Sequence, residues 1–523
     1  IELALRRELW RRGLRYRVDR SVVIKRRRHD IVFIGVRVVV DIRGCFWHSC
    51  PLHGSMPKSN SDWWRTKLET NRRRDADTEV RLREAGWEIV VVWEHDDVAE
   101  VADRIEALVR ARSGLRPAGV ASTGSEPPGC SLDAVPLADS FSVAGLFAGI
   151  GGIEVGLTDS GGHAELLCEW WEPAQAVLRA RFPGAEVVGD VREIDALPDV
   201  DVVTAGFPCT DLSLAGRMSG ITGQASGLVT EVFRLLEKQP APVIVFENVR
   251  NMLRLDRGEA MTFLVDRLEA LGYRWAYRLV DSRFTGVPQR RQRVIMVAAT
   301  DIDPAAVLFA DDAGEPDDDY FSHDAYGFYW TEGRRGLGWA VDAIPTLKGG
   351  STIGIPSPPA IWNPHAETGR QIVTPSIAEA EALQGFSKGW TAPADEVCGR
   401  KGTRWKMLGN AVTTGVSRWI GERLVEPGDL CGTQSLLARS DRWPAAAFGS
   451  DGTAIAIDVS MWPTHEPYRH LADLVDLGNA TPLSARATAG FHDRTLASTL
   501  RFADGFVEAV GEHREAMADL QAA

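Results

Sequence analysis

Between Phe141 and Thr300, runs of strand length alternate with stretches of helical length, and this alternation restricts the fold more than any other feature of the chain. Such alternation is typical of βαβ units, in which parallel strands build one sheet. We therefore predict an α/β fold for this part of the chain. The 523 residues, 44% of them hydrophobic, are too many for one ordinary core, so two or three domains are expected.

A segment rich in Gly, Pro, Ser and Ala, residues 113–140, has neither helical nor strand periodicity and is predicted to be a linker. At about 28 residues, a flexible linker has a root-mean-square span of roughly 30 Å. We expect one α/β domain before this linker, over 1–112, and a second domain that begins after it, at residue 141. Acidic, glycine, proline and aromatic residues interrupt the alternation over about 301–370, which indicates an inserted target-recognition region. The pattern of 426–523 predicts a folded extension of unknown role.

The net charge of −13 is unevenly divided along the chain. Residues 1–112 hold 24 Lys and Arg against 18 Asp and Glu, a net charge of +6, which leaves −19 for the remainder. DNA binding needs Lys and Arg gathered on one face, so an acidic remainder does not exclude it. The charge therefore indicates a basic N-terminal domain and decides nothing about the larger half.

The sequence predicts neither a membrane span nor a disulfide framework. The longest apolar run, Ile31 to Ile42, is interrupted by Arg37, whereas a span needs roughly 20 uninterrupted residues. Seven cysteines scattered along the chain suit a reducing compartment. No basic-then-apolar leader precedes the fold, and Ile1 indicates a truncated N-terminus. We expect a cytoplasmic, nucleoid-associated protein, taken to be a monomer.

A glycine-rich turn follows the strand 141–147 and opens a helix. Glycines there let a ligand approach the backbone, although a plain tight turn is the alternative. Two acids favour a ligand, because Glu169 follows the next apolar strand and Asp190 ends the third, where carboxylates can bind ribose hydroxyls and an amino group. This order is typical of S-adenosylmethionine sites. The candidate cofactor-binding residues are Gly149, Gly151, Gly152, Glu169 and Asp190.

Further strand ends carry reactive side chains. Cys209 lies in a turn after one strand, Glu247 ends another, and Arg291 and Arg293 enter a third. A lone cysteine is most often a buried packing residue. A nucleophile, an acid and an arginine pair at successive strand ends instead indicate a catalytic constellation.

Four motifs occur in one order along the chain: Pro208-Cys209, Glu247-Asn248-Val249, Gln289-x-Arg291-x-Arg293 and Gly409-Asn410-Ala411-Val412. Over about residues 141–425 the chain resembles DNA cytosine-5 methyltransferases, whose motifs have this order. The resemblance implies a Rossmann-like class I methyltransferase domain that uses S-adenosylmethionine and double-stranded DNA. It also implies that Cys209 attacks C6 of a flipped cytosine, that Glu247 donates to N3, and that Arg293 holds the O2 edge.

The family pattern extends these roles to three neighbours. It implies that Phe147 packs near the cofactor, that Pro208 shapes the cysteine turn, and that Asn410 belongs to the cofactor site. Trp170, beside Glu169, is expected either to stack on adenine or to be a core residue. The chemistry agrees, because a thiolate added at C6 makes C5 reactive toward a methyl group. Positive charge such as Arg291 favours the thiolate, and the base must leave the duplex to be reached.

A short loop in the N-terminal domain concentrates metal-binding side chains. Structural zinc takes four cysteine or histidine ligands, and the candidates are Cys45, Cys50, His53 and His95. Separate buried residues are the alternative to a zinc site. The adjacent Phe46 and Trp47 are core by default, but aromatic side chains on a basic loop also suit a wedge between base pairs.

Carboxylates on separate predicted elements can converge on one hydrated magnesium ion that activates water against a phosphodiester. The candidates are Glu2, Asp30, His48 and Asp75. Together with Cys45-Phe46-Trp47-His48 and Asn71-x-x-Arg74-Asp75, they make residues 1–112 resemble very-short-patch repair endonucleases, which nick DNA beside thymine-guanine mismatches. The resemblance implies a restriction-endonuclease-like α/β fold that uses magnesium. Arg43 departs from the family pattern, because a histidine or another small polar residue is expected there.

The first hypothesis for the whole chain is therefore a bifunctional enzyme that writes 5-methylcytosine and nicks the mismatch left when this base deaminates. The alternative is an active methyltransferase with a catalytically dead nuclease domain that only binds DNA or senses mismatches. Methylation of RNA is a third hypothesis, disfavoured because 301–364 is large enough to read a duplex. A cognate restriction endonuclease is a further possible partner, and no membrane is expected.

Overall fold

The computed structural model describes residues 136–207, 227–329, 337–349, 358–400, 402–438, 442–498 and 500–522. Within 1–112 it describes residues 17–20, 29–33, 36–43, 77–83, 85–93 and 98–112, with isolated positions between them. The chain divides into two compact units, Ile1–Gly129 and Cys130–Ala523, and each is described by itself. None of the helices in the described ranges combines the length and the hydropathy of a membrane-spanning segment.

The N-terminal unit contains a mixed four-stranded sheet in the order β1 (Arg17–Arg20), β2 (His29–Phe33), β3 (Val38–Arg43) and β4 (Glu88–Trp93). The first three strands are antiparallel, and β3 and β4 are parallel. Helix α3 (Val98–Arg112) packs on the sheet through a core that includes Ile31, Val40, Val92 and Ile105. The apolar run from Ile31 to Ile42 thus forms most of two strands, β2 and β3, rather than one continuous segment.

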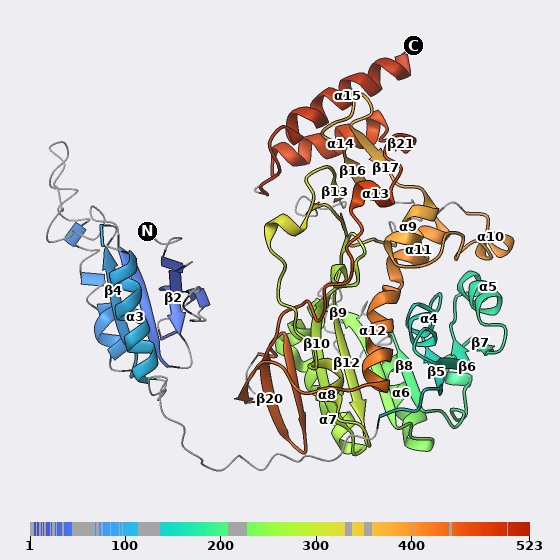
Figure 1. Cartoon of the computed structure of the whole chain (residues 1–523), viewed down its shortest axis with the longest axis horizontal. Helices are drawn as coiled ribbons and strands as arrows, with labels where there is room; N and C mark the ends of the chain where they lie inside the picture. Colours follow the sequence, from blue (N-terminus) through green and yellow to red (C-terminus); the bar gives the residue numbers. More distant parts are fainter. Residues whose placement is uncertain are drawn as a thin grey trace. The chain divides into compact units, whose positions relative to one another are not determined.

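The C-terminal unit is built on a ten-stranded sheet (Figure 1). The strand order is β18 (Thr433–Leu437), β20 (Thr453–Asp458), β19 (Ala446–Ser450), β10 (Arg274–Asp281), β12 (Gln292–Ala299), β9 (Val243–Val249), β8 (Val202–Ala205), β5 (Phe141–Leu146), β6 (Gly162–Cys168) and β7 (Glu186–Val188). Strands β5 to β9 are parallel, and the chain order reverses beside β5. Doubly wound sheets bind ligands at such a reversal. The prediction of an α/β fold is confirmed.

The central strands are buried on both faces, as expected for parallel strands covered by helices. Val143, Val202 and Val245 face α4 (Gly152–Thr158), α8 (Pro304–Leu308) and α12 (Thr414–Val425). The alternate residues Ala144, Val203 and Phe246 face α6 (Gly227–Lys238) and α7 (Glu259–Ala270).

A second layer contains a five-stranded sheet, which we call the small sheet. Its strand order is β14 (Gly338–Val341), β13 (Tyr326–Tyr329), β16 (Ala360–Trp362), β17 (Ile372–Thr374) and β21 (Thr481–Pro482). Helices α14 (Ala485–Leu496) and α15 (Phe506–Ala522) cover it through Phe491, Phe506 and Val510. Strands β11 (Gln289–Arg290) and β15 (Ile344–Pro345) form a separate parallel pair.

Residues 426–523 thus contribute to both sheets. Strand β19 pairs with β10 at one side of the large sheet, and β18 and β20 extend it further. Farther along, β21 adds the last strand of the small sheet by pairing with β17. The segment to which the sequence assigns no role is therefore part of the fold of the larger unit.

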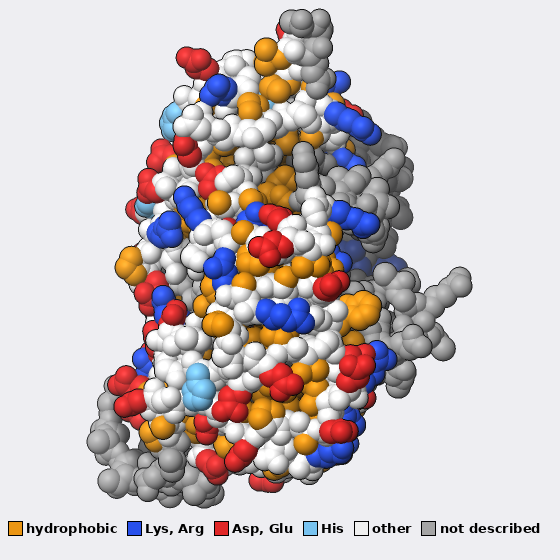
Figure 2. All heavy atoms as spheres, turned by 90° about the vertical axis from the view of Figure 1, so that its right-hand side faces the viewer, with side chains coloured by type: hydrophobic (Ala, Val, Ile, Leu, Met, Phe, Trp, Pro, Cys, Tyr) orange, Lys and Arg blue, Asp and Glu red, His pale blue; other side chains and the backbone are white. Residues whose placement is uncertain are grey.

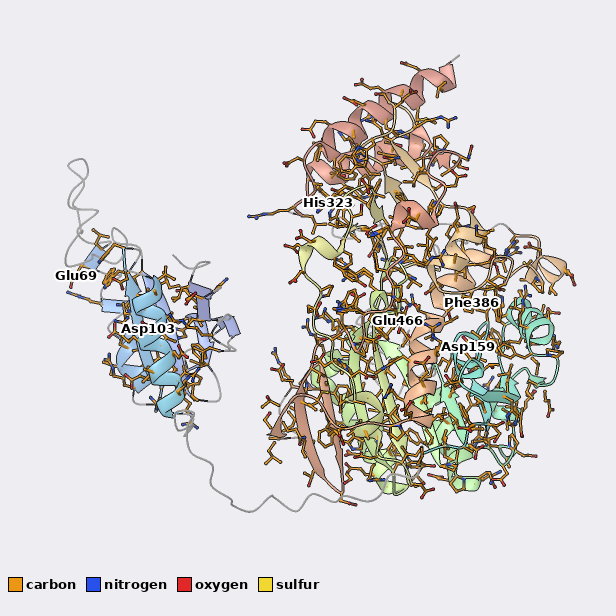
Figure 3. The ribbon with its side chains drawn as sticks, viewed as in Figure 1. Glu69, Asp103, Asp159, His323, Phe386 and Glu466 are labelled. Carbon is orange, nitrogen blue, oxygen red and sulfur yellow. The ribbon has the colours of Figure 1, made fainter. Side chains whose placement is uncertain are left out.

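A helical layer connects the two sheets. It contains α5 (Glu172–Arg181), α9 (Ile377–Leu383), α10 (Ala394–Val397), α11 (Thr403–Asn410) and α13 (Leu471–Leu474). In Figures 1 and 3, α9 and α11 lie beside α4, and Phe386 belongs to this layer. A Cβ placed on Gly152 would lie 3.3 Å from Phe386 Cζ, which shows how closely the layer packs on the turn that opens α4.

The described surface of the larger unit shows no separation of charge on the side drawn in Figure 2. Acidic and basic side chains are interspersed over this face, with small hydrophobic areas between them. On this face, charge alone therefore does not identify a surface that binds nucleic acid.

Candidate active site

A cavity of about 900 Å³ opens at the edge of the large sheet where the parallel strands end. Ligand cavities in proteins commonly have this size. Strand β12 runs antiparallel to β9, so its first residues lie where the last residues of β9 lie. The predicted residues that line the cavity are Phe147, Gly149, Glu169, Trp170, Asp190, Glu247, Arg291, Arg293 and Asn410.

The turn between β5 and α4 has the backbone geometry that its glycines permit. Phe147, Gly149 and Gly151 have φ angles of 56°, 59° and 79°. A side chain at Gly151 would collide with the ring of Phe182, whereas a Cβ at Gly149 would meet no atom within 4 Å. Gly149 therefore leaves the backbone open on the cavity side, where a ligand can approach it.

Glu169 stabilises this turn. Its carboxylate accepts hydrogen bonds from the backbone N–H groups of Gly149, at 2.9 Å, and Trp171, at 2.8 Å. Burial raises the pKa of Glu169, while these two donors oppose the shift. The acid is thus a fixed, partly desolvated wall of the cavity.

Trp170 and Asp190 lie on the cavity wall with different environments. The side chain of Trp170 is 82% exposed, so the expectation that it is a core residue is wrong and its ring is available to a ligand. Asp190 accepts a hydrogen bond from the backbone N–H of Arg192 and forms an ion pair with its guanidinium at 2.6 Å. The side chain of Arg192 lowers the pKa of Asp190, which holds the carboxyl ionised.

Glu247 and Arg293 form an ion pair at the cavity. The distance between Glu247 Oε1 and Arg293 Nε is 2.7 Å, and both side chains are largely buried. A Cβ on Gly206 would lie 4.0 Å from Glu247 Oε2, so the start of the predicted cysteine turn lies against this carboxyl. Pro208 and Cys209 themselves lie outside the described residues.

Arg291 is fully buried and bound to backbone. Its guanidinium donates to the carbonyl oxygens of Ala411, at 2.7 Å, and Gly409, at 3.3 Å. Burial, together with the neighbouring charge of Arg293, lowers the pKa of Arg291 well below its usual value. Arg291 therefore joins the start of β12 to the segment that contains Asn410, and its predicted effect on Cys209 stays a prediction.

Lys406 and Trp171 also line the cavity, and sequence reasoning missed both. Lys406 Nζ lies 4.6 Å from the centroid of the Trp171 ring. One signal was present, because Lys406 precedes Asn410 by one helical turn and residues so spaced share a helix face.

Most of the predicted nuclease residues lie outside the described residues: Glu2, Cys45, Phe46, Trp47, His48, Cys50, His53 and Asp75. Asp30, on β2, accepts a hydrogen bond from the backbone N–H of Ile42 at 2.6 Å. His95 lies 3.5 Å from Asp96. In the described part of the chain, no three His, Cys, Asp or Glu side chains are grouped as metal ligands. Arg43 forms an ion pair with Glu79 at 2.9 Å.

Residues 141–311 match the family described as C-5 cytosine-specific DNA methylase, and residues 1–52 match DNA mismatch endonuclease Vsr. The chain is 44% identical over 383 residues to the Type II methyltransferase M2.BsuMI of Bacillus subtilis, covering 71% of this chain and 97% of that protein. It is 35% identical over 154 residues to M.BsuFI of Bacillus subtilis, a match that covers 29% of this chain and 37% of that protein. The chain is also similar to the structure of the Dnmt2 methyltransferase from S. pombe, with 15% sequence identity and a TM-score of 0.41 over 55% of this chain and 98% of that one.

Proposed function

The chain belongs to the C-5 cytosine-specific DNA methylase family and carries a Vsr-type domain at its N-terminus, and we propose that its larger unit methylates C5 of cytosine within a specific duplex DNA sequence. The observation that carries this proposal is the ion pair of Glu247 and Arg293 at the cavity, beside Gly206 and the start of the cysteine turn. An acid and a cation placed together at a strand-end cavity suit a base whose N3 and O2 must both be bound.

The described cavity fits S-adenosylmethionine, the cofactor of this family. Gly149 leaves the backbone open, the exposed ring of Trp170 can stack on adenine, and Glu169 and Asp190 can accept from hydroxyl and amino groups. When bound, S-adenosylmethionine supplies an electrophilic methyl group. The cavity volume of about 900 Å³ leaves room for the target base beside the cofactor.

Each residue of the site has its own role in the proposed reaction. The thiolate of Cys209 forms a bond to C6 of the extruded base, while Glu247, which takes up a proton from solvent as the base binds, shares that proton with N3 and so makes C5 nucleophilic. Arg293 binds the O2 edge and orients Glu247 through their ion pair. After methyl transfer, C5 loses its proton to a base and the thiolate leaves C6, which restores the aromatic ring. Arg291 acts at a distance by fixing the segment of Asn410 against β12.

The experiment that tests this function is the sequencing of methylated cytosines in DNA from cells that express the full chain. We expect 5-methylcytosine at one short sequence, and none in cells that express Cys209→Ala. Methylation at cytosines without a common sequence would contradict sequence-specific recognition. Unmethylated DNA from the wild-type chain would contradict the function.

For the N-terminal unit we propose magnesium-dependent nicking beside thymine-guanine mismatches. The support is the match of residues 1–52 to Vsr, together with the net charge of +6 over 1–112. In this proposal Asp30, Glu2, His48 and Asp75 hold hydrated magnesium, and Phe46 and Trp47 separate base pairs. The donor set of Cys45, Cys50, His53 and His95 has the chemistry of a structural zinc site.

The competing proposal is a dead nuclease domain that only binds DNA or senses mismatches. It is favoured by Arg43, whose ion pair with Glu79 gives this residue a structural partner. Nicking rates on mismatched duplexes decide between the two, with Asp30→Ala as the control. Magnesium-dependent nicking that Asp30→Ala abolishes supports an active nuclease. Mismatch binding without nicking supports the dead domain.

M2.BsuMI of Bacillus subtilis is described as a Type II methyltransferase, and this description favours a restriction-modification setting for the chain. We infer that a restriction endonuclease of the same recognition sequence accompanies it. Such an enzyme should not cleave DNA that the chain has methylated.

A further inference from the structure

We propose that Lys406 binds the carboxylate of the amino-acid part of S-adenosylmethionine and so defines one end of the cofactor site. This inference rests on the proposed methyltransferase function and adds to it a positioning residue and the ligand group that this residue recognises.

The position of Lys406 is fixed on two sides. Its ammonium lies 4.6 Å from the centroid of the Trp171 ring, within the range of a cation–π contact. Its Cγ would be 3.4 Å from a Cβ placed on Gly349, so the aliphatic stem packs on the backbone there. The same Cβ would be 3.3 Å from Asn410 Oδ1, which shows that Lys406 and Asn410 share one face of α11. Both residues line the cavity.

The charges of the cavity single out Lys406. Arg293 forms an ion pair with Glu247, Arg192 forms one with Asp190, and Arg291 donates to backbone carbonyls. Lys406 forms no ion pair with a carboxylate in the described part of the chain, although it lines the same cavity. Burial raises the pKa of Glu169, and the positive charge of Lys406 is near enough to this acid to act against that increase.

The cofactor has one anionic group at neutral pH, its carboxylate. Burying a carboxylate without a partner is costly, so a cavity rich in acids needs a cation or N–H donors for it. Glu169, Asp190 and Glu247 repel this group, and the cations paired with Asp190 and Glu247 are already compensated. Among the described cavity cations, Lys406 can receive the carboxylate without breaking an ion pair or the backbone hydrogen bonds that hold Arg291.

The test is calorimetric titration of the full chain with S-adenosylhomocysteine and with its decarboxylated analogue, which differ by the carboxylate alone. The wild-type chain should bind S-adenosylhomocysteine about tenfold more tightly than the analogue, the size expected for a hydrogen bond to a charged group. Lys406→Gln should reduce this ratio to about one, because it loses affinity only for the ligand that carries the carboxylate. Lys406→Arg should keep most of the ratio.

The matched control is Lys238→Gln. Lys238 is an exposed lysine on α6 that donates to the backbone oxygen of Asp195, and it does not line the cavity. This variant should retain the wild-type ratio, and thermal unfolding checks that all variants are folded.

Three results would overturn the proposal. A ratio that Lys406→Gln leaves unchanged excludes the carboxylate contact. An unchanged ratio with weaker DNA binding and a shallower salt dependence assigns Lys406 to a DNA phosphate instead. If the wild-type chain binds neither ligand, the methyltransferase proposal fails as well, so the two failures are distinguishable.

Discussion

Replacing Phe506 with alanine should destabilise the larger unit, because the C-terminal helices complete the core of the small sheet. The Phe506 side chain is 0% exposed, and its ring centroid lies 4.5 Å from Trp339, 5.1 Å from Phe328 and 5.2 Å from Trp362. Removing a buried phenylalanine ring costs about 3–5 kcal/mol through lost apolar burial and the cavity left behind. A loss in this range is therefore expected for Phe506→Ala.

Urea unfolding followed by tryptophan fluorescence measures this loss, because Trp339 and Trp362 lie in the affected cluster. The matched control is Leu520→Ala, on the same helix, whose side chain is 69% exposed. Its effect should stay within about 0.5 kcal/mol. Equal stability of Phe506→Ala and the wild-type chain would refute the conclusion that the C-terminal helices complete this core.

Three further predictions concern other parts of the chain. The side-chain hydrogen bond to Asp342 raises the pKa of His470 above its usual value of about 6.5. The contact therefore stabilises the fold fully below about pH 6.5, and this stabilisation is lost as the pH rises through the raised pKa. Thermal unfolding from pH 6 to pH 9 should show the loss in the wild-type chain and not in His470→Gln. Trp170→Ala should weaken S-adenosylhomocysteine binding at least about fivefold in calorimetry, since a lost stacking contact costs on the order of 1–3 kcal/mol. It should leave the unfolding temperature unchanged because the ring is exposed, and unchanged binding would exclude the stacking role. Cys50→Ala should release about one zinc per chain and unfold the N-terminal unit, since structural zinc contributes on the order of 10 kcal/mol to folding; full zinc retention in elemental analysis would favour separate buried residues.

The sequence predicted the part of the fold in which local patterns carry the information. Strands 202–205 and 243–249 are visible as apolar runs, and Glu247 on the second lies beside Gly206 after the first because parallel strands end at one edge of a sheet. The antiparallel β12 brings Arg291 and Arg293 to the same edge. The cavity was therefore predictable in its main residues.

The remaining features depend on contacts between distant segments. Val373 pairs with Pro482 in the small sheet, and Trp275 pairs with Gly449 in the large sheet. The local periodicity of the sequence predicts neither of these strand pairings. The role of 426–523 in both sheets was hidden for this reason. Lys406 was missed because its position over Trp171 follows from the packing of α11 on the start of α5.

Covalent trapping of the chain on DNA tests the proposed chemistry most directly. Duplex DNA that carries 5-fluorocytosine at the target should form a stable adduct in the presence of S-adenosylmethionine, because fluorine at C5 cannot leave as a proton and the thiolate of Cys209 stays bound to C6. The control is Cys398→Ala, a free cysteine whose pKa is lowered by a hydrogen bond with Thr403, and this variant should form the adduct normally. Cys209→Ala should form none, and an adduct of equal yield from that variant would contradict the proposal that Cys209 is the nucleophile.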